Sequence, residues 1–173
     1  MKRTERLLID RLRTPVGDLA VVADEAGHLH AVGFTDGHDR MSSFLERDGL
    51  VRAKDPSGLT SALEAYFEGE LAAIAGLCVA LRGTDFQNAV WRGLLTIPCG
   101  ETRSYGELAR QVGRPKAVRA VGLANGSNPI GIVVPCHRVI GSNGTLTGYG
   151  GGLERKRWLL AHEGVTIGEA RSA

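Results

Sequence analysis

The chain has 173 residues, a hydrophobic content of 43%, a charged content of 23% and a formal net charge of +2. This length suits one ordinary domain or two small ones, and the composition is that of a globular protein. No apolar run approaches the ~18 residues of a membrane span, no secretory signal is evident, and the three widely spaced cysteines do not form a disulfide framework. We therefore expect a cytoplasmic protein with no membrane partner and with reduced thiols.

The first third of the chain alternates short apolar segments with turn residues, which predicts an antiparallel meander. The expected strands are 7–13, 19–23 and 28–34, joined by turns at 14–18 and 24–27. Ser57 is expected to cap a helix that includes Leu59 and Phe67, and 77–81 is expected to return as a strand. These elements predict a small α+β domain with an antiparallel sheet.

From residue 84 onward the signals become helical, so we expect an N-terminal domain over 1–83 and a C-terminal domain over 84–173. Asp85 is expected to cap a helix whose apolar stripe ends before Pro98. Ser104 and Glu107 form the capping-box pattern of a second helix, which runs to Val112 before Gly113 breaks it.

Pro115 suits the first turn of a third helix, which closes around 125–126. The second and third helices, with their short turn, are typical of a helix-turn-helix. The third helix carries small residues around Arg119, which would let its backbone approach another surface closely; they are Ala117, Ala120, Gly122 and Ala124. An Ala-rich helix buried against its neighbour is the alternative. The net charge of +2 is too small to indicate nucleic acid, although 100–125 has an excess of three positive charges.

The segment 135–139 sets the thiol of Cys136 beside the imidazole of His137, at the end of the apolar run 130–134. A free thiol titrates near ~8.5 and becomes a useful nucleophile when a neighbouring base or positive charge lowers that value. His137 and Arg138 could supply both, and Pro135 could bend the expected strand so that Cys136 and His137 cooperate. A buried strand-end cysteine followed by two surface residues is the alternative.

Six glycines lie within 141–152, so this segment is not expected to form a regular element. Its backbone N–H groups are free to meet a ligand, and a simple mobile loop is the alternative. An amphipathic helix follows from Leu153 to Glu163 and stops at Gly164.

Several separate motifs agree in order and spacing with one known family. They are 104–109, 119–122, 128–129, 132–140, 148–149, 151–152 and 158–163. With them the chain resembles the O6-alkylguanine-DNA alkyltransferases, or methylated-DNA–protein-cysteine methyltransferases, most densely over 84–164. Cys136 stands where the inactive alkyltransferase-like proteins carry tryptophan. The resemblance implies an α+β fold, with a ribonuclease H-like N-terminal domain and a helical C-terminal domain that contains the helix-turn-helix.

The resemblance implies DNA repair by direct, irreversible transfer of the alkyl group from O6-alkylguanine to Cys136, without a cofactor and with one lesion repaired per molecule. The implied partner is double-stranded DNA, bound through its minor groove by a monomer, with cooperative assembly on DNA left open. The target nucleotide is flipped out of the stack before transfer. Alkyl size and the choice between O6-guanine and O4-thymine are left open.

The resemblance also assigns roles to single residues. His137 would act through water as the base, Glu163 would orient His137, and Asn128 would fix the turn that bears Cys136. Tyr105 would help rotate the nucleotide and bond its base, Arg119 would fill the vacated space, and Ala117, Ala120 and Gly122 would permit close approach. The remaining expected DNA and substrate contacts are Arg138, Val139, Tyr149 and Gly150. Gly150 stands where several relatives carry serine, so only backbone N–H groups would meet the lesion there.

Two other functions are compatible with parts of the sequence. A helix-turn-helix regulator without chemistry would explain the basic two-helix segment but not Cys136 and His137. A cysteine hydrolase would use Cys136, His137 and Glu163 as nucleophile, base and orienter, and it would turn over. Zinc is reported in some family members, but the five histidines form no ligand spacing with Cys78 or Cys99, so we expect no metal. These histidines are His28, His30, His38, His137 and His162.

Overall fold

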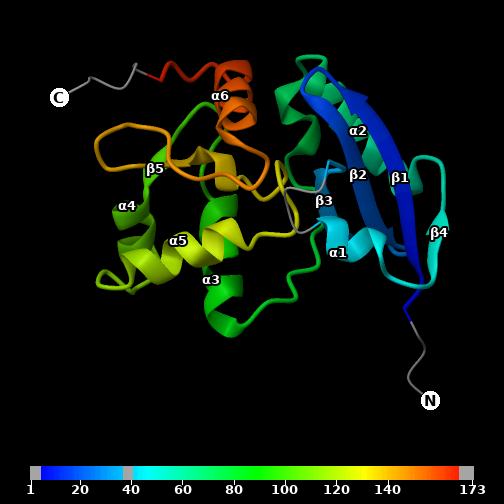
Figure 1. Ribbon diagram of the computed structural model, residues 1–173, viewed down its shortest axis with the longest axis horizontal. Helices are drawn as coiled ribbons and strands as arrows, with labels where there is room; N and C mark the ends of the chain where they lie inside the picture. Colours follow the sequence, from blue (N-terminus) through cyan, green and yellow to red (C-terminus); the bar gives the residue numbers. More distant parts are fainter. Residues whose placement is uncertain (1–4, 37–40, 168–173) are drawn as a thin grey trace. The chain divides into compact units, whose positions relative to one another are not determined.

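The computed structural model describes residues 5–36 and 41–167, and the chain divides into two compact units, Met1–Ala80 and Leu81–Ala173 (Figure 1). His38 lies outside the described residues. None of the helices within them is both long enough and apolar enough to cross a membrane.

The first unit is built on a four-stranded sheet in the order β3-β2-β1-β4. Its strands are β1 (Leu7–Thr14), β2 (Gly17–Asp24), β3 (Leu29–Phe34) and β4 (Leu50–Arg52). The first three form the predicted antiparallel meander, and β4 adds a parallel edge beside β1. Because β4 has only three residues, its sequence shows no alternation from which it could be predicted.

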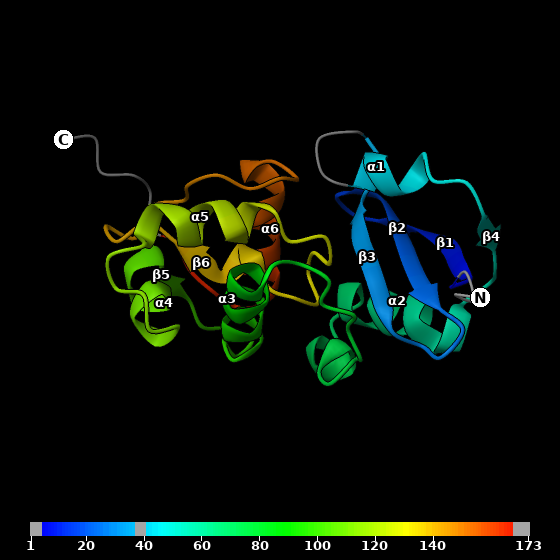
Figure 2. The same cartoon turned by 90° about the horizontal axis from the view of Figure 1, so that it is seen from below.

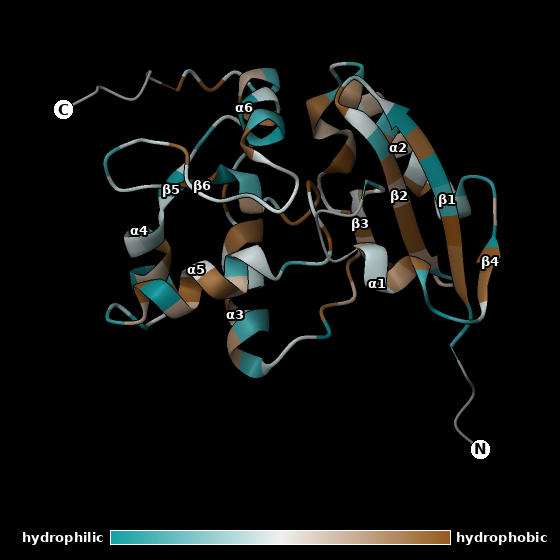
Figure 3. Cartoon of the chain, viewed as in Figure 1, coloured by the Kyte–Doolittle hydropathy of each residue, from teal (hydrophilic) through white to brown (hydrophobic). Residues whose placement is uncertain are grey.

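Helices cover this sheet on both faces. On one face Ala20, Val22 and Ala31 pack with Met41 of α1 (Met41–Leu45). Since side chains alternate along a strand, Leu19 and Val21 face the other way, where α2 (Leu59–Phe67) contacts β1. Figure 2 shows α1 and α2 on opposite faces, and Figure 3 shows that β2 is hydrophobic along most of its length.

Two local predictions for this unit are wrong. Ser57 does not cap α2, because it lies inside the 3-10 turn Pro56–Gly58 with φ 52°, and Gly58 occupies the cap position with φ 72°. The segment 77–81 forms only an isolated parallel bridge between Leu29 and Val79. A further 3-10 turn, Leu71–Ile74, lies between α2 and that bridge.

The second unit contains the predicted helices. They are α3 (Asp85–Leu95), α4 (Tyr105–Gln111), α5 (Val118–Gly126) and α6 (Leu153–His162). Two of them, α3 and α5, have shifted starting points. Ser104 and Glu107 form the predicted capping box of α4. The cap of α3 is Thr84 and not Asp85, since Thr84 and Gln87 form a second capping box. Pro115 precedes α5, which begins only after Ala117 (φ −97°, ψ 35°).

Close contacts hold α3 against the two helices of the helix-turn-helix. Trp91 Nε1 donates to the Ala124 carbonyl at 2.9 Å, which joins α3 to α5. A Cβ atom on Gly93 would lie 3.0 Å from Leu108 Cδ1, so glycine allows α3 to approach α4. Ala124 is therefore one of the small residues that face inward, and it is 3% exposed.

A two-residue parallel ladder brings distant parts of this unit together. In it β5 (Arg103–Ser104) pairs with β6 (Val139–Ile140). β5 leads directly into α4, and β6 directly follows the 3-10 turn η3 (Cys136–Arg138). The ladder thus fixes the start of α4 beside the segment that carries the candidate nucleophile.

Candidate active site

Cys136 is the first residue of η3 and is 8% exposed. The expected strand over 130–134 is absent, because Ile132 has φ 71° and this left-handed backbone breaks an extended run. Pro135 (φ −82°, ψ 64°) leads the chain into η3, so Cys136 and His137 share one turn. The bend expected at Pro135 is present, although it follows a turn and not a strand.

Two asparagines anchor the segment that ends in Cys136. Asn128 donates through Nδ2 to the Val134 carbonyl at 2.7 Å, and its Oδ1 accepts from the Ile130 N–H at 2.9 Å. Asn125, on α5, donates to the Cys136 carbonyl at 3.3 Å. These bonds satisfy backbone groups that a strand would have paired, and they hold the turn without a sheet.

His137 belongs to a buried ionic network. Its Nε2 lies 2.8 Å from Glu163 Oε1, and both side chains are 0% exposed. Arg138 donates through Nε to Glu163 Oε2 at 2.9 Å and through Nη2 to Oε1 at 2.8 Å. Arg138 Nη1 also donates to the Ile97 carbonyl at 2.7 Å, which ties the network to the end of α3. Arg138 is therefore better placed to hold Glu163 than to contact substrate.

Burial leaves His137 neutral and able to accept a proton. Burial acts to raise the pKa of Glu163, but hydrogen bonds from His137 and Arg138 lower it to about 2. Burial lowers the pKa of His137, although Glu163 opposes this effect. Since an ionised Glu163 only accepts hydrogen bonds, His137 Nε2 carries the proton and Nδ1 keeps its lone pair. Within the described residues, His137 Nδ1 is a buried atom without a hydrogen-bond partner.

Lys156 is a site residue that the sequence reasoning missed. It lies on α6 at 0% exposure, and its Nζ donates to the carbonyls of Val139 at 2.6 Å and Thr147 at 2.8 Å. It thus joins β6 to the glycine-rich segment. Burial lowers its pKa to about 8, and Cys136 acts in the opposite direction. The charged run 154–157 gave no signal for this position, because such runs usually mark a solvated helix face.

Tyr105 and the glycine-rich segment lie next to each other. Tyr105 Oη accepts from Thr147 Oγ1 at 3.3 Å, and a Cβ atom on Gly122 would lie 3.8 Å from Tyr105 Cδ1. Tyr149 is half-buried and Gly150 is exposed. As predicted, 141–152 contains no helix or strand. The Val139 carbonyl already accepts from Lys156, but a carbonyl oxygen has a second lone pair for a base.

The outer face of α5 carries Arg119 and Ala120, which are exposed, with Ala117 and Gly122 partly so. Val118 and Leu123 are also exposed there, and the sequence reasoning did not single them out. The face of α5 on which small residues surround Arg119 therefore also carries two larger apolar side chains, Val118 and Leu123.

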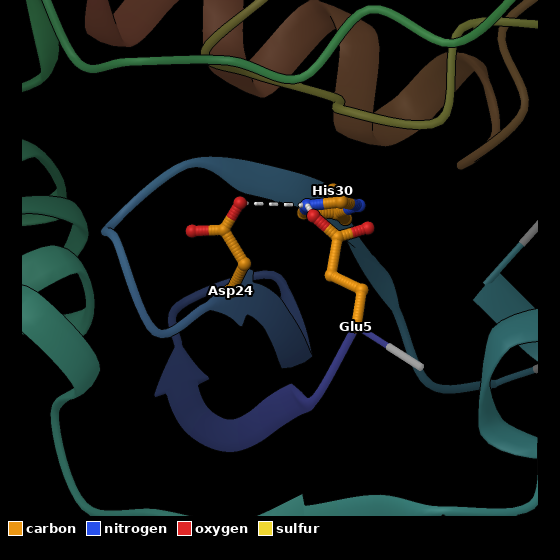
Figure 4. Close-up of side chains that lie close together, drawn as sticks. All are labelled: Glu5, Asp24 and His30. Carbon is orange, nitrogen blue, oxygen red and sulfur yellow. Dashed lines mark hydrogen bonds and ion pairs between the residues drawn. The ribbon is translucent and has the colours of Figure 1, made fainter. Parts of the chain in front are cut away.

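Three side chains of the first unit form the group in the described residues that could hold a metal ion. Glu5, Asp24 and His30 place ligand atoms within 4.8 Å of one another (Figure 4). This set combines two carboxylates with one histidine from separate parts of the sequence, so the spacing of histidines and cysteines does not reveal it. Asp24 Oδ1 also accepts from the N–H groups of Ala26 at 2.9 Å and His28 at 3.0 Å. These bonds give Asp24 a structural role in the β2–β3 turn, and the absence of a metal stays a prediction.

Comparison with known proteins gives matches over most of the chain. Residues 8–81 match the family described as 6-O-methylguanine DNA methyltransferase, ribonuclease-like domain, and 85–165 match its DNA binding domain. The methylated-DNA–protein-cysteine methyltransferase of Shigella flexneri is 53% identical over 168 residues, which cover 94% of this chain and 98% of that protein.

Three solved structures are also similar. The O6-methylguanine methyltransferase of Mycobacterium tuberculosis has a TM-score of 0.78 at 47% identity, covering 91% of this chain and 92% of that one. The M. tuberculosis protein OGT in complex with DNA has the same TM-score of 0.78, identity and coverage. The O6-methylguanine-DNA methyltransferase of Pyrococcus kodakaraensis has a TM-score of 0.69 at 26% identity, covering 92% of this chain and 99% of that one.

Proposed function

Since this chain belongs to the 6-O-methylguanine DNA methyltransferase family, we propose that its Cys136 takes the alkyl group directly from O6-alkylguanine in DNA. The observation that carries this assignment is the buried network behind Cys136, in which His137 keeps an unpartnered Nδ1 while Glu163 holds Nε2. Such an arrangement suits removal of a thiol proton at neutral pH.

The reaction is a displacement at the alkyl carbon. Cys136 loses its proton, through water, to His137 Nδ1, and the resulting imidazolium is stabilised by Glu163. The sulfur then forms a bond to the alkyl carbon while the bond between that carbon and O6 breaks. The electron pair of the broken bond stays on the guanine oxygen, and the guanine takes up a proton. The product is a thioether, which water does not cleave, so each molecule repairs one lesion.

Substrate binding involves the elements around this turn. We assign the walls of the guanine pocket to Tyr149 and the backbone of Gly150, and the contact to the exocyclic amine to the Val139 carbonyl. Tyr105 and Arg119 act on the flipped nucleotide and on the space that it leaves. Ala117, Ala120 and Gly122 let α5 lie close to the minor groove of double-stranded DNA. The protein acts as a monomer in this scheme.

The experiment is intact-mass analysis after the protein is mixed with an O6-methylguanine oligonucleotide. We expect the mass of one methyl group on Cys136 and stoichiometric loss of the lesion. Cys136→Ala should abolish transfer while DNA binding persists, because α5 is a separate element. Repeated turnover would instead indicate a cysteine hydrolase, and DNA binding without any transfer would indicate a regulator.

A further inference from the structure

The outer face of α5 carries a large exposed leucine next to Arg119. Leu123 is 72% exposed, compared with 40% to 48% for Val118, Leu95 and Leu153. Arg119 and Leu123 are four positions apart, so they are neighbours on the helix surface. Val121, Ala124 and Asn125 form the buried face of the same helix. Leu123 therefore adds little to the packing of the fold.

The surroundings of Leu123 indicate what would cover it. Exposed basic residues lie just before this helix, at Arg114 and Lys116, and on it, at Arg119. Ala120 and Gly126 lie three positions before and after Leu123 on the helix surface, and these two neighbours are too small to screen it. In Figure 3, hydrophobic and hydrophilic bands alternate along α5. An apolar side chain within a positive surface matches a polyanion that also offers apolar sugar and base surfaces.

We propose that Leu123 is an apolar DNA contact, which enters the minor groove beside Arg119 and packs against the deoxyribose and base edges next to the flipped nucleotide. This inference rests on the proposed function and adds a residue that distinguishes duplex DNA from the free base. Proteins that bend or open the minor groove use leucine and similar side chains as wedges between base steps. Arg119 supplies a positive charge at the same place, while Leu123 buries apolar surface against the DNA.

An apolar contact differs from a phosphate contact in its dependence on salt. Each lysine or arginine that neutralises a phosphate makes binding weaker as salt rises, whereas burial of a leucine does not release counterions. Leu123→Ala should thus lower affinity at every salt concentration and leave the slope of log affinity against log salt unchanged. Lys116→Ala should make that slope shallower by about 1.

Affinity is measured with duplex oligonucleotides in a Cys136→Ala background, so that the result does not depend on transfer. Leu123→Ala should bind duplex roughly fivefold more weakly, while Leu123→Met should keep most of the affinity and Leu123→Asn should lose it. Alanine is a strong helix former, so the helix itself is not weakened. The matched control is Leu95→Ala, which removes an exposed leucine from α3 and should change nothing.

A second measurement uses the protein with Cys136 intact. Leu123→Ala should react with free O6-benzylguanine at the wild-type rate and with duplex DNA more slowly. Equal duplex affinity for Leu123→Ala and Leu95→Ala would overturn the proposal, as would equal loss of rate on both substrates. Wild-type protein that reacts with neither substrate would refute only the proposed function. The affinity measurements would then still test whether Leu123 contacts duplex DNA.

Discussion

At the scale of single residues, the pairing of Glu163 with Arg138 changes what a substitution of Glu163 means. From the sequence, Glu163→Gln would be expected to preserve the fold and to slow transfer by removing the charge that stabilises a protonated His137. In the structure the same change also leaves Arg138 as a buried cation that has lost its two bonds to a carboxylate. Breaking one partner of a buried ion pair typically costs about 3–5 kcal/mol.

We therefore expect Glu163→Gln to lower the free energy of unfolding by about 3 kcal/mol and to slow alkyl transfer. Adding Arg138→Met should restore most of the stability, because both charges are then removed, but it should not restore the rate. Denaturant unfolding and single-turnover reaction with O6-benzylguanine across pH 5–9 would measure the two effects separately. A wild-type pH profile in Glu163→Gln would show that Glu163 serves only the fold.

Arg119 provides a second test at this scale. Because it is exposed on α5 and stands beside Leu123, Arg119→Ala should slow repair of duplex DNA by roughly tenfold or more while leaving reaction with free O6-benzylguanine unchanged. Single-turnover rates on the two substrates would be compared with those of Arg92→Ala, an exposed arginine on α3. Equal losses on both substrates would place Arg119 in chemistry or folding.

At the scale of elements, two capping boxes lie at the starts of two helices, α3 and α4, which have different roles. Thr84 Oγ1 accepts from the Gln87 N–H at 3.1 Å at the start of α3, and Ser104 Oγ accepts from the Glu107 N–H at 3.1 Å at the start of α4. Either change to alanine should cost about 1 kcal/mol of stability. Only Ser104→Ala should also slow transfer from DNA, since α4 begins with Tyr105. Thermal unfolding and single-turnover rates would measure both, and equal rates for the two variants would contradict the assigned role of α4.

The elements also show which parts of the structure the sequence could predict. Helices and the three-strand meander follow from local patterns, as does the capping box at Ser104. The strand predicted before Cys136 is wrong because the apolar run there resembles a buried strand, while the left-handed Ile132 and the bonds from Asn128 are set by tertiary contacts. The same holds for Lys156, whose burial depends on carbonyl groups distant in the sequence.

At the scale of the whole molecule, each unit contains a buried carboxylate whose pKa is held near 2. In the first unit burial acts to raise the pKa of Asp24, but hydrogen bonds from His28 and His30 lower it to about 2. In the second unit the pKa of Glu163 is also about 2. A carboxyl group whose folded pKa is depressed adds stability above its unfolded pKa, near ~4, and loses that contribution as pH falls through the folded value.

We therefore expect the free energy of unfolding to be steady near neutral pH and to fall steadily from about pH 5 towards pH 2. Asp24→Asn should be less stable at pH 7 and should show a shallower decline, because one of the two groups no longer titrates. Denaturant unfolding at a series of pH values would measure this, with Asp85→Asn as an exposed control. A decline as steep as that of wild type would contradict the role given to Asp24.

The burial of Lys156 also makes this side chain a chemical reporter of loop opening. Lys54 and Lys116 are exposed and should be acylated quickly by an amine-reactive reagent, whereas Lys156 is sealed beneath the carbonyls that it binds. Burial lowers the pKa of Lys156 to about 8 only while the site is closed, and opening of the glycine-rich segment should expose its amine to the reagent. Peptide mass spectrometry over a time course would thus report how often that segment leaves Lys156, and bound duplex DNA should slow the labelling.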